Sequence, residues 1–120
     1  MRQFDTGATR DSEDGKYDFE AFFSPKVLDR RACYMHKNRH QADGSLRDGD
    51  NWQKGIPLTA YIKSAFRHFM SWWRAHRNGD YEAAEEAICA LMFNCEGYLH
   101  EILKPKDKKY SHNNQGGCCA

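Results

Sequence analysis

The sequence predicts an all-α fold: a small helical bundle of three main helices with a long functional loop and flexible termini. Three segments repeat apolar residues at the spacing of an amphipathic helix, and tracts rich in glycine or aspartate separate them. With 120 residues, the chain has room for one compact core. We expect one helical domain over residues 1–104 and a disordered tail over residues 105–120, where no periodicity remains.

The first helix is expected to start at Ser24-Pro25 and to run to about His40. Serine is a favoured N-cap, and proline suits the first helical position because its missing N–H would have no partner there. The apolar side chains that recur at helical spacing are Val27, Leu28, Ala32 and Met35. The preceding residues 1–20 are polar and rich in turn-forming types, so we expect a loop or an arm.

The second helix is expected from about Pro57 to His76 and shows the strongest periodicity in the chain. Its predicted buried stripe consists of Leu58, Tyr61, Ile62, Ala65, Phe66, Phe69, Trp72, Trp73 and His76. One short chain can hardly bury so broad an aromatic surface, so the sequence predicts a homo-oligomer. On this assignment, Phe66→Ala would open a core cavity and cost roughly 3 to 5 kcal/mol of stability.

The third helix is expected to follow the stop at Asn78-Gly79-Asp80 and to end near Lys104-Pro105. Its predicted apolar stripe consists of Ala84, Ile88, Leu91, Cys95, Tyr98 and Ile102. A second stripe of small residues consists of Ala83, Ala87, Ala90, Asn94 and Gly97. Small side chains let another backbone come close, so either a helix of the same chain or a second copy could pack there.

Charge and composition exclude several classes of protein. The 18 Lys and Arg residues nearly balance the 17 Asp and Glu residues, leaving a net charge of +1. No overall positive field therefore attracts duplex nucleic acid. No apolar run approaches the roughly 20 residues that span a bilayer, and the N-terminus lacks an apolar signal region. We expect a cytoplasmic protein with neither a membrane nor duplex nucleic acid as its partner.

Cysteine spacing indicates reduced thiols. The five cysteines form no C-x-x-C pair and are odd in number, so neither a zinc knuckle nor a disulfide framework is indicated. Cys89 and Cys95 fall within a helical pattern and are predicted as small residues in or near the core. Cys118 and Cys119 fall in the predicted tail.

The connection 41–55 is the leading candidate for a binding site, because a structureless loop of this length is uncommon in a small domain and is often functional. Trp52 could stack on a base, and Asn51 could bond to the edge of the base. Arg47 and Lys54 could neutralise phosphate. The alternative interpretation is a solvated loop held by one buried tryptophan.

Further candidate ligand contacts come from the N-terminal segment and from the helices. Thr9 and Arg10 follow Gly7 in a tract with the chemistry of a phosphate-binding turn, although a plain surface turn explains it equally well. The remaining candidates are Lys16, Arg67, His68 and Asn94. His68 titrates near neutral pH and could contact phosphate or transfer a proton, but a structural role is the commoner one.

Metal binding is less well supported by the sequence. His36 and His40 stand four residues apart, the spacing at which two imidazole side chains on a helix can bind one metal ion. The neighbouring Lys37 and Arg39 disfavour binding of a cation there. Glu82 and Glu85 begin the third helix and would be the ligands if a divalent ion bound. No second set of carboxylates follows on a facing helix, so we expect no metal cofactor.

Several blocks occur in the same order as in a known family: TGATR, DGKYD, SPKVLDR, YMHKNR, DGSLRDGDNWQKGIP, SAFRHFMSWW and ALMFNCEGYLHE. Over about residues 5 to 103 the chain resembles a family of small phage proteins labelled dATP/dGTP diphosphohydrolase, N-terminal domain. The resemblance implies a phage protein in the cytoplasm of an infected bacterium. The label implies cleavage of purine deoxynucleoside triphosphates to monophosphate and pyrophosphate.

All-α enzymes with that activity hold Mg²⁺ with paired motifs of the E-x-x-E and E-x-x-D type. Here only Glu82-x-x-Glu85 complies, and no E-x-x-D follows. We therefore expect a binding protein that captures a nucleotide or a nucleotide-derived, even cyclic, immune signal without hydrolysing it, and so counteracts host defence. The alternative is a Mg²⁺-dependent dATP/dGTP diphosphohydrolase, or its accessory N-terminal domain, acting in phage nucleotide metabolism.

Overall fold

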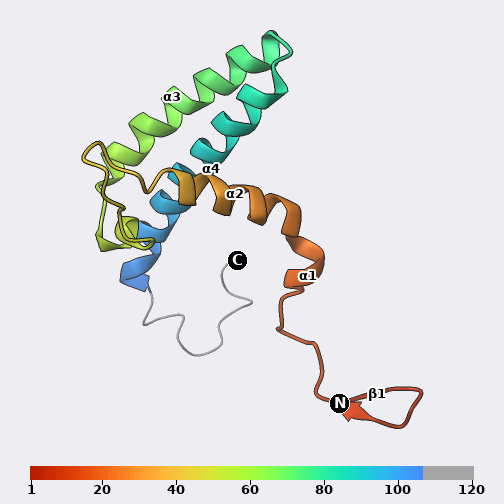
Figure 1. Ribbon diagram of the computed structural model, residues 1–120. Helices are drawn as coiled ribbons and strands as arrows, with labels where there is room; N and C mark the ends of the chain where they lie inside the picture. Colours follow the sequence, from red (N-terminus) through yellow and green to blue (C-terminus); the bar gives the residue numbers. More distant parts are fainter. Residues whose placement is uncertain (107–120) are drawn as a thin grey trace.

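The fold, seen in a computed structural model that describes residues 1–106, is mostly helical (Figure 1). The helices are α1 (Phe19–Phe22), α2 (Pro25–Lys37), α3 (Leu58–Arg77) and α4 (Tyr81–Leu103). Two short 3-10 helices, η1 and η2, cover Asn51–Lys54 and Lys104–Lys106, and two-residue strands β1 (Arg2–Gln3) and β2 (Thr9–Arg10) pair antiparallel. The predicted three main helices are confirmed, whereas α1 and the strand pair were not expected.

Helix α2 begins where the sequence indicated. The Ser24 side chain accepts a hydrogen bond from the Val27 amide at 3.3 Å, and Pro25 occupies the first helical position. The helix ends at Lys37, three residues before the expected end at His40. Asn38 caps it: its side-chain amide donates to the Tyr34 carbonyl at 2.8 Å, and the next backbone amide, that of Arg39, donates to the His36 carbonyl in a tighter turn.

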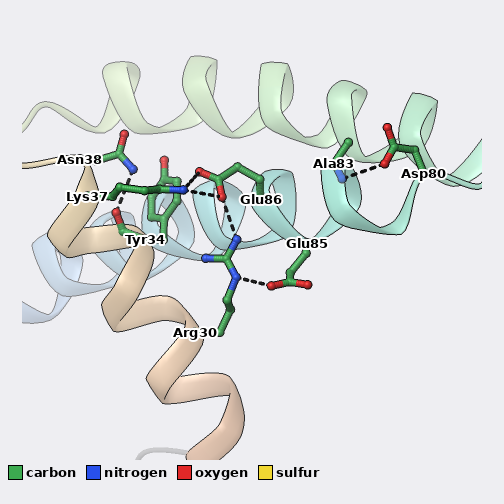
Figure 2. Close-up of polar contacts among 8 residues, drawn as sticks. All are labelled: Arg30, Tyr34, Lys37, Asn38, Asp80, Ala83, Glu85 and Glu86. Carbon is green, nitrogen blue, oxygen red and sulfur yellow. Dashed lines mark hydrogen bonds and ion pairs between the residues drawn. The ribbon is translucent and has the colours of Figure 1, made fainter.

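Helices α3 and α4 form an antiparallel hairpin around the predicted turn. Gly79 has a φ of +67°, a left-handed conformation that ends α3 and that glycine adopts without strain. Asp80 then caps α4 by accepting a hydrogen bond from the Ala83 amide at 3.1 Å (Figure 2).

The core of the hairpin is the stripe of small residues on α4. Ala87, Ala90, Asn94 and Gly97 are all buried. The Tyr61 ring of α3, only 1% exposed, lies so close to Gly97 that a Cβ added there would sit 2.3 Å from the Tyr61 Cζ. A helix of the same chain therefore covers this stripe from Ala87 to Gly97, whereas Ala83, the first residue of the predicted stripe, is exposed.

The prediction that the large apolar residues of α3 form the core is wrong for a single chain. Phe66 is 66% exposed, and Phe69, Trp72 and Trp73 are 36 to 46% exposed. The reason is geometric: the close approach at Gly97 turns the Tyr61–Ala75 side of α3 toward α4 and the broader aromatic side away from it.

The apolar stripe predicted on α4 is likewise only partly covered. Ala84 is buried, Leu91 and Ile88 are half-buried, and Ile102 is 39% exposed. Of the two cysteines predicted near the core, Cys89 is buried and Cys95 is exposed.

Helix α2 lies across α4 and is held there largely by charge (Figures 1 and 2). Arg30 donates to Glu85 and Glu86, the latter at 2.7 Å. Arg31 donates to Glu96 at 3.0 Å, and Lys37 lies 3.3 Å from Glu86. The predicted apolar stripe of α2 is poorly covered, because Val27 is 43% and Leu28 50% exposed.

The N-terminal segment lies apart from the hairpin of α3 and α4. Residues 1–23 form an arm that projects away from α3 and α4 (Figure 1). The predicted tail starts as the 3-10 helix Lys104–Lys106, and its remainder, with Cys118 and Cys119, lies outside the described residues. Within residues 1–106, no helix is long and apolar enough to cross a membrane.

Candidate functional site

A cleft of about 360 Å³ lies between the end of α2, the connection from α2 to α3, and the middle of α4. Helix α2 contributes Tyr34 and Met35, and α4 contributes Phe93. The connection supplies the remaining side chains, which are Asn38, Arg39, His40, Arg47, Asp48, Gly49, Asn51, Trp52 and Ile56. The volume falls at the lower end of the range of small-molecule sites, about 300 to 1,000 Å³.

Two arginines stand opposite each other at the start of the connection. The Arg47 amide donates to the Arg39 carbonyl at 2.8 Å, and the Arg39 Nε donates to the Arg47 carbonyl at 2.7 Å. Between them His40 and Leu46 form an antiparallel bridge, and Gly44 closes the turn with a φ of +86°. This small hairpin brings two arginines, eight residues apart in sequence, to the lining of the same cleft.

The charge of the cleft is dominated by these arginines. Among residues 1–106, neither Arg39 nor Arg47 forms an ion pair with a carboxylate. Asp48, the acidic residue that lines the cleft in this described part of the chain, lies 3.5 Å from the Lys54 ammonium. Adjacent cations without acidic partners repel each other, and an anion between them removes that repulsion and accepts hydrogen bonds from both.

The opposite wall of the cleft is aromatic. The Trp52 ring meets Phe93 edge-on at 6.3 Å and His100 at 4.8 Å between ring centroids. Lys104 and Glu101 hold the backbone of this segment onto α4: Lys104 Nζ donates to the Gln53 carbonyl at 3.1 Å, and Glu101 accepts from the Ile56 amide at 3.4 Å. Trp52 is thereby fixed as a half-buried platform, the kind of surface on which a base stacks.

Hydrogen-bonding groups lie between the cationic and the aromatic sides. Burial raises the pKa of Tyr34, and the charge of Glu86 raises it further, so the Tyr34 hydroxyl stays protonated and can donate at neutral pH. The side-chain nitrogen of Asn38 donates to the Tyr34 carbonyl, so the side-chain oxygen of Asn38 is left as an acceptor. Asn51 adds a second amide.

Three of the residues predicted from the sequence are brought together here: Arg47, Asn51 and Trp52. Lys54 lies next to the cleft rather than in it, since its ammonium faces Asp48 and its side chain is 64% exposed.

The other predicted contacts do not line this cleft in a single chain. Thr9, Arg10 and Lys16 lie on the projecting arm (Figure 1), and Arg67 is exposed on α3. His68 is half-buried on α3, where burial, and then the charge of Arg67, lowers its pKa and keeps it neutral. Asn94 is buried and donates to the Ala90 carbonyl at 2.8 Å. Their role in ligand binding stays a prediction.

Sequence analysis missed Arg39 and Phe93, two residues central to the cleft. It placed residues 36–40 at the end of the first helix, which in fact stops at Lys37. One signal was available: the tract QADGS, which contains Asp43-Gly44, is typical of a tight hairpin turn, and Arg39 and Arg47 lie on either side of it. No local signal points to Phe93, because only the tertiary fold brings it to Trp52.

Of the two carboxylates predicted as metal ligands, Glu85 is engaged by an arginine. Glu85 and its neighbour Glu86 accept hydrogen bonds from Arg30, which lowers the pKa of Glu86 (Figure 2). Glu82 is exposed on the first turn of α4. Residues 1–106 contain no group of three or more His, Cys, Asp or Glu side chains that could hold a metal ion. Since the Arg30 guanidinium occupies Glu85, these residues do not fit a Mg²⁺ site.

Comparison with curated proteins and with solved structures found no match. Residues 6–111 match the family described as dATP/dGTP diphosphohydrolase, N-terminal. The matched stretch includes α2, α3, α4 and every residue that lines the cleft. The chain therefore belongs to the family of dATP/dGTP diphosphohydrolase N-terminal domains.

Proposed function

We propose that the chain binds a purine nucleotide in the cleft, with the phosphates between Arg39 and Arg47 and the base against Trp52. The observation that supports this most strongly is the pair of facing arginines without an acidic partner among the described residues. Guanidinium groups bind phosphate oxygens in a bidentate fashion. The family description names dATP and dGTP, which supports a purine as the base.

The nucleotide is held without being hydrolysed. Glu85, which a metal-dependent reaction would need, is already bound to Arg30. A protein that binds a nucleotide and releases it intact lowers its free concentration. In an infected bacterium, such capture would counteract a nucleotide immune signal of the host, which is the use that we propose for this chain.

A second candidate function is the diphosphohydrolase reaction that the family description names. It requires the described residues to act with further carboxylates, because Glu82 and Glu85 alone do not fit a metal site. The two functions differ in what happens to the ligand: capture returns the triphosphate unchanged, and hydrolysis releases pyrophosphate.

Calorimetry with dGTP and dATP, with and without Mg²⁺, tests the proposal. Arg47→Ala should weaken binding about 10- to 150-fold, because losing one charge-assisted hydrogen bond to phosphate costs about 1.5 to 3 kcal/mol. Its side chain forms no ion pair within residues 1–106, so the variant should fold normally. Lys26→Ala is the matched control, since it removes one exposed positive charge at the far end of α2.

Chromatography of the nucleotide released by denaturing the complex then separates capture from hydrolysis. Intact dGTP supports capture, and dGMP with pyrophosphate supports the enzyme. Unchanged affinity in Arg47→Ala, together with lost affinity in Arg67→Ala, would place the ligand on α3 and overturn the proposed cleft.

A further inference from the structure

The outer face of α3 combines aromatic side chains with positive charge. We define this face by Lys63, Phe66, Met70, Trp73 and Arg74, which lie on the side of the helix opposite Tyr61 and Ala75. Phe66 is 66% and Trp73 46% exposed, and a groove of about 350 Å³ runs beside Trp73 and Arg74. Helix α3 contains four Lys and Arg residues and no Asp or Glu, a net charge of +4.

The N-terminal arm, residues 1–23, has the complementary character. It contains six Asp and Glu residues against three Lys and Arg residues, a net charge of −3. Three phenylalanines at its base, Phe19, Phe22 and Phe23, are 64%, 69% and 55% exposed. The arm is therefore acidic and aromatic, whereas the outer face of α3 is basic and aromatic.

We propose that the arm of one copy docks on the outer face of α3 of a second copy, and that the exchange is reciprocal. Opposite net charges steer the two surfaces together, and the exposed aromatic rings supply apolar area. With about 200 Å² for each aromatic side chain, scaled by its exposed fraction, the five rings of one contact offer about 600 Å² and the two reciprocal contacts about 1,200 Å². That is the lower end of the size of a stable protein interface, roughly 1,200 to 2,000 Å².

The position of the arm favours a second copy over the same chain. The arm leaves the molecule at the end remote from α3 (Figure 1), in a protein whose longest extent is 57 Å. It is followed directly by α2, which the Arg30 and Arg31 ion pairs fix across α4. An arm anchored in this way points away from the α3 of its own chain and is free to reach that of a neighbour.

A charge-swap experiment on the full chain tests the exchange by sedimentation velocity. Asp14→Lys with Glu20→Lys reverses charge on the arm, and Lys63→Glu with Arg74→Glu reverses it on the outer α3 face, from +2 to −2; none of these four side chains is in an ion pair within residues 1–106. The wild type should be dimeric. Each double variant alone should dimerise at least 10-fold more weakly, because its arm and its outer α3 face then have like charge.

Mixing the two double variants gives the decisive result. In the mixed dimer each arm meets an outer α3 face of opposite charge at both contacts, so dimers should return to the wild-type level. Lys26→Glu, a single reversal on α2, should stay dimeric, and circular dichroism checks that every variant is folded. A monomeric wild type, a double variant as dimeric as the wild type, or a mixture that stays monomeric would each overturn the proposal.

Discussion

Gly97→Ala probes the closest approach in the hairpin of α3 and α4. In an unconstrained helix this change stabilises by about 1 kcal/mol. Here the new Cβ would lie 2.3 to 2.5 Å from three atoms of the Tyr61 ring, where about 3.5 to 4 Å is comfortable. Tyr61 is 1% exposed and packed between the two helices, so either its ring must shift or α3 and α4 must separate. Overpacking costs about 1 to 3 kcal/mol, and contacts this close fall at the upper end of that range, so after the helix gain we expect a net loss of about 2 kcal/mol.

A double-mutant cycle with Tyr61→Leu isolates the contact. Leucine lacks the Cε1, Cζ and hydroxyl atoms that Gly97 faces, and it also removes a buried hydroxyl without a hydrogen-bond partner among the described residues. In the leucine background, alanine at 97 should stabilise the protein by about 0.5 to 1 kcal/mol. Urea unfolding of the four proteins measures both effects. If alanine has the same effect in both backgrounds, Tyr61 does not pack against Gly97 and the helix packing is wrong.

Two further predictions concern the surface of α3 and the junction of α2 with α4. Phe66→Ala should change the stability of the isolated monomer by less than about 1 kcal/mol, because the ring is 66% exposed. Thermal melting at low protein concentration measures this change. A loss of about 3 kcal/mol would mean that Phe66 does belong to the core of the single chain. Arg30→Met should flatten the acid side of the stability profile. The Arg30 hydrogen bond lowers the pKa of Glu86, so its contribution is complete above the ordinary glutamate pKa and is lost as pH falls through the lowered one. Melts from neutral pH to about pH 3 should show a smaller fall in the variant than in the wild type.

Local signals in the sequence predicted the helix boundaries well. Ser24 with Pro25, and Asp80 after Gly79, act through hydrogen bonds and backbone conformations within a few residues, so they can be recognised without the fold. The end of α2 was placed too late because Asn38, which stops the helix, lies within a run that continues the helical pattern.

The buried face of α3 could not be chosen from the sequence alone. Periodicity identified an apolar stripe that includes both Tyr61 and Phe66, but it records how apolar a face is and not how much of that face a single chain can cover. The structure uses the narrow Tyr61 side, because small residues on α4 allow a close approach there. The wide aromatic side is left exposed, as expected for a surface that a second copy covers.

The candidate site was predictable only where its residues are close in sequence. Arg47, Asn51 and Trp52 stand within six residues of one another, so composition could group them. Arg39 reaches the cleft through a backbone hairpin, and Phe93 through the packing of η1 on α4. Contacts of both kinds depend on pairing between distant residues, which spacing along a single chain does not encode.

The way this chain distributes its arginines supports the cleft as a place for an anion. Arg30 and Arg31 face three glutamates of α4, and each donates to at least one of them. Arg39 and Arg47, by contrast, have no glutamate or aspartate partner among the described residues. Both line the cleft, and the carboxylate of Asp48, which lines it too, faces Lys54. An anion in this cleft would accept hydrogen bonds from two arginines that no carboxylate of the described residues engages, so a negatively charged ligand best explains their arrangement.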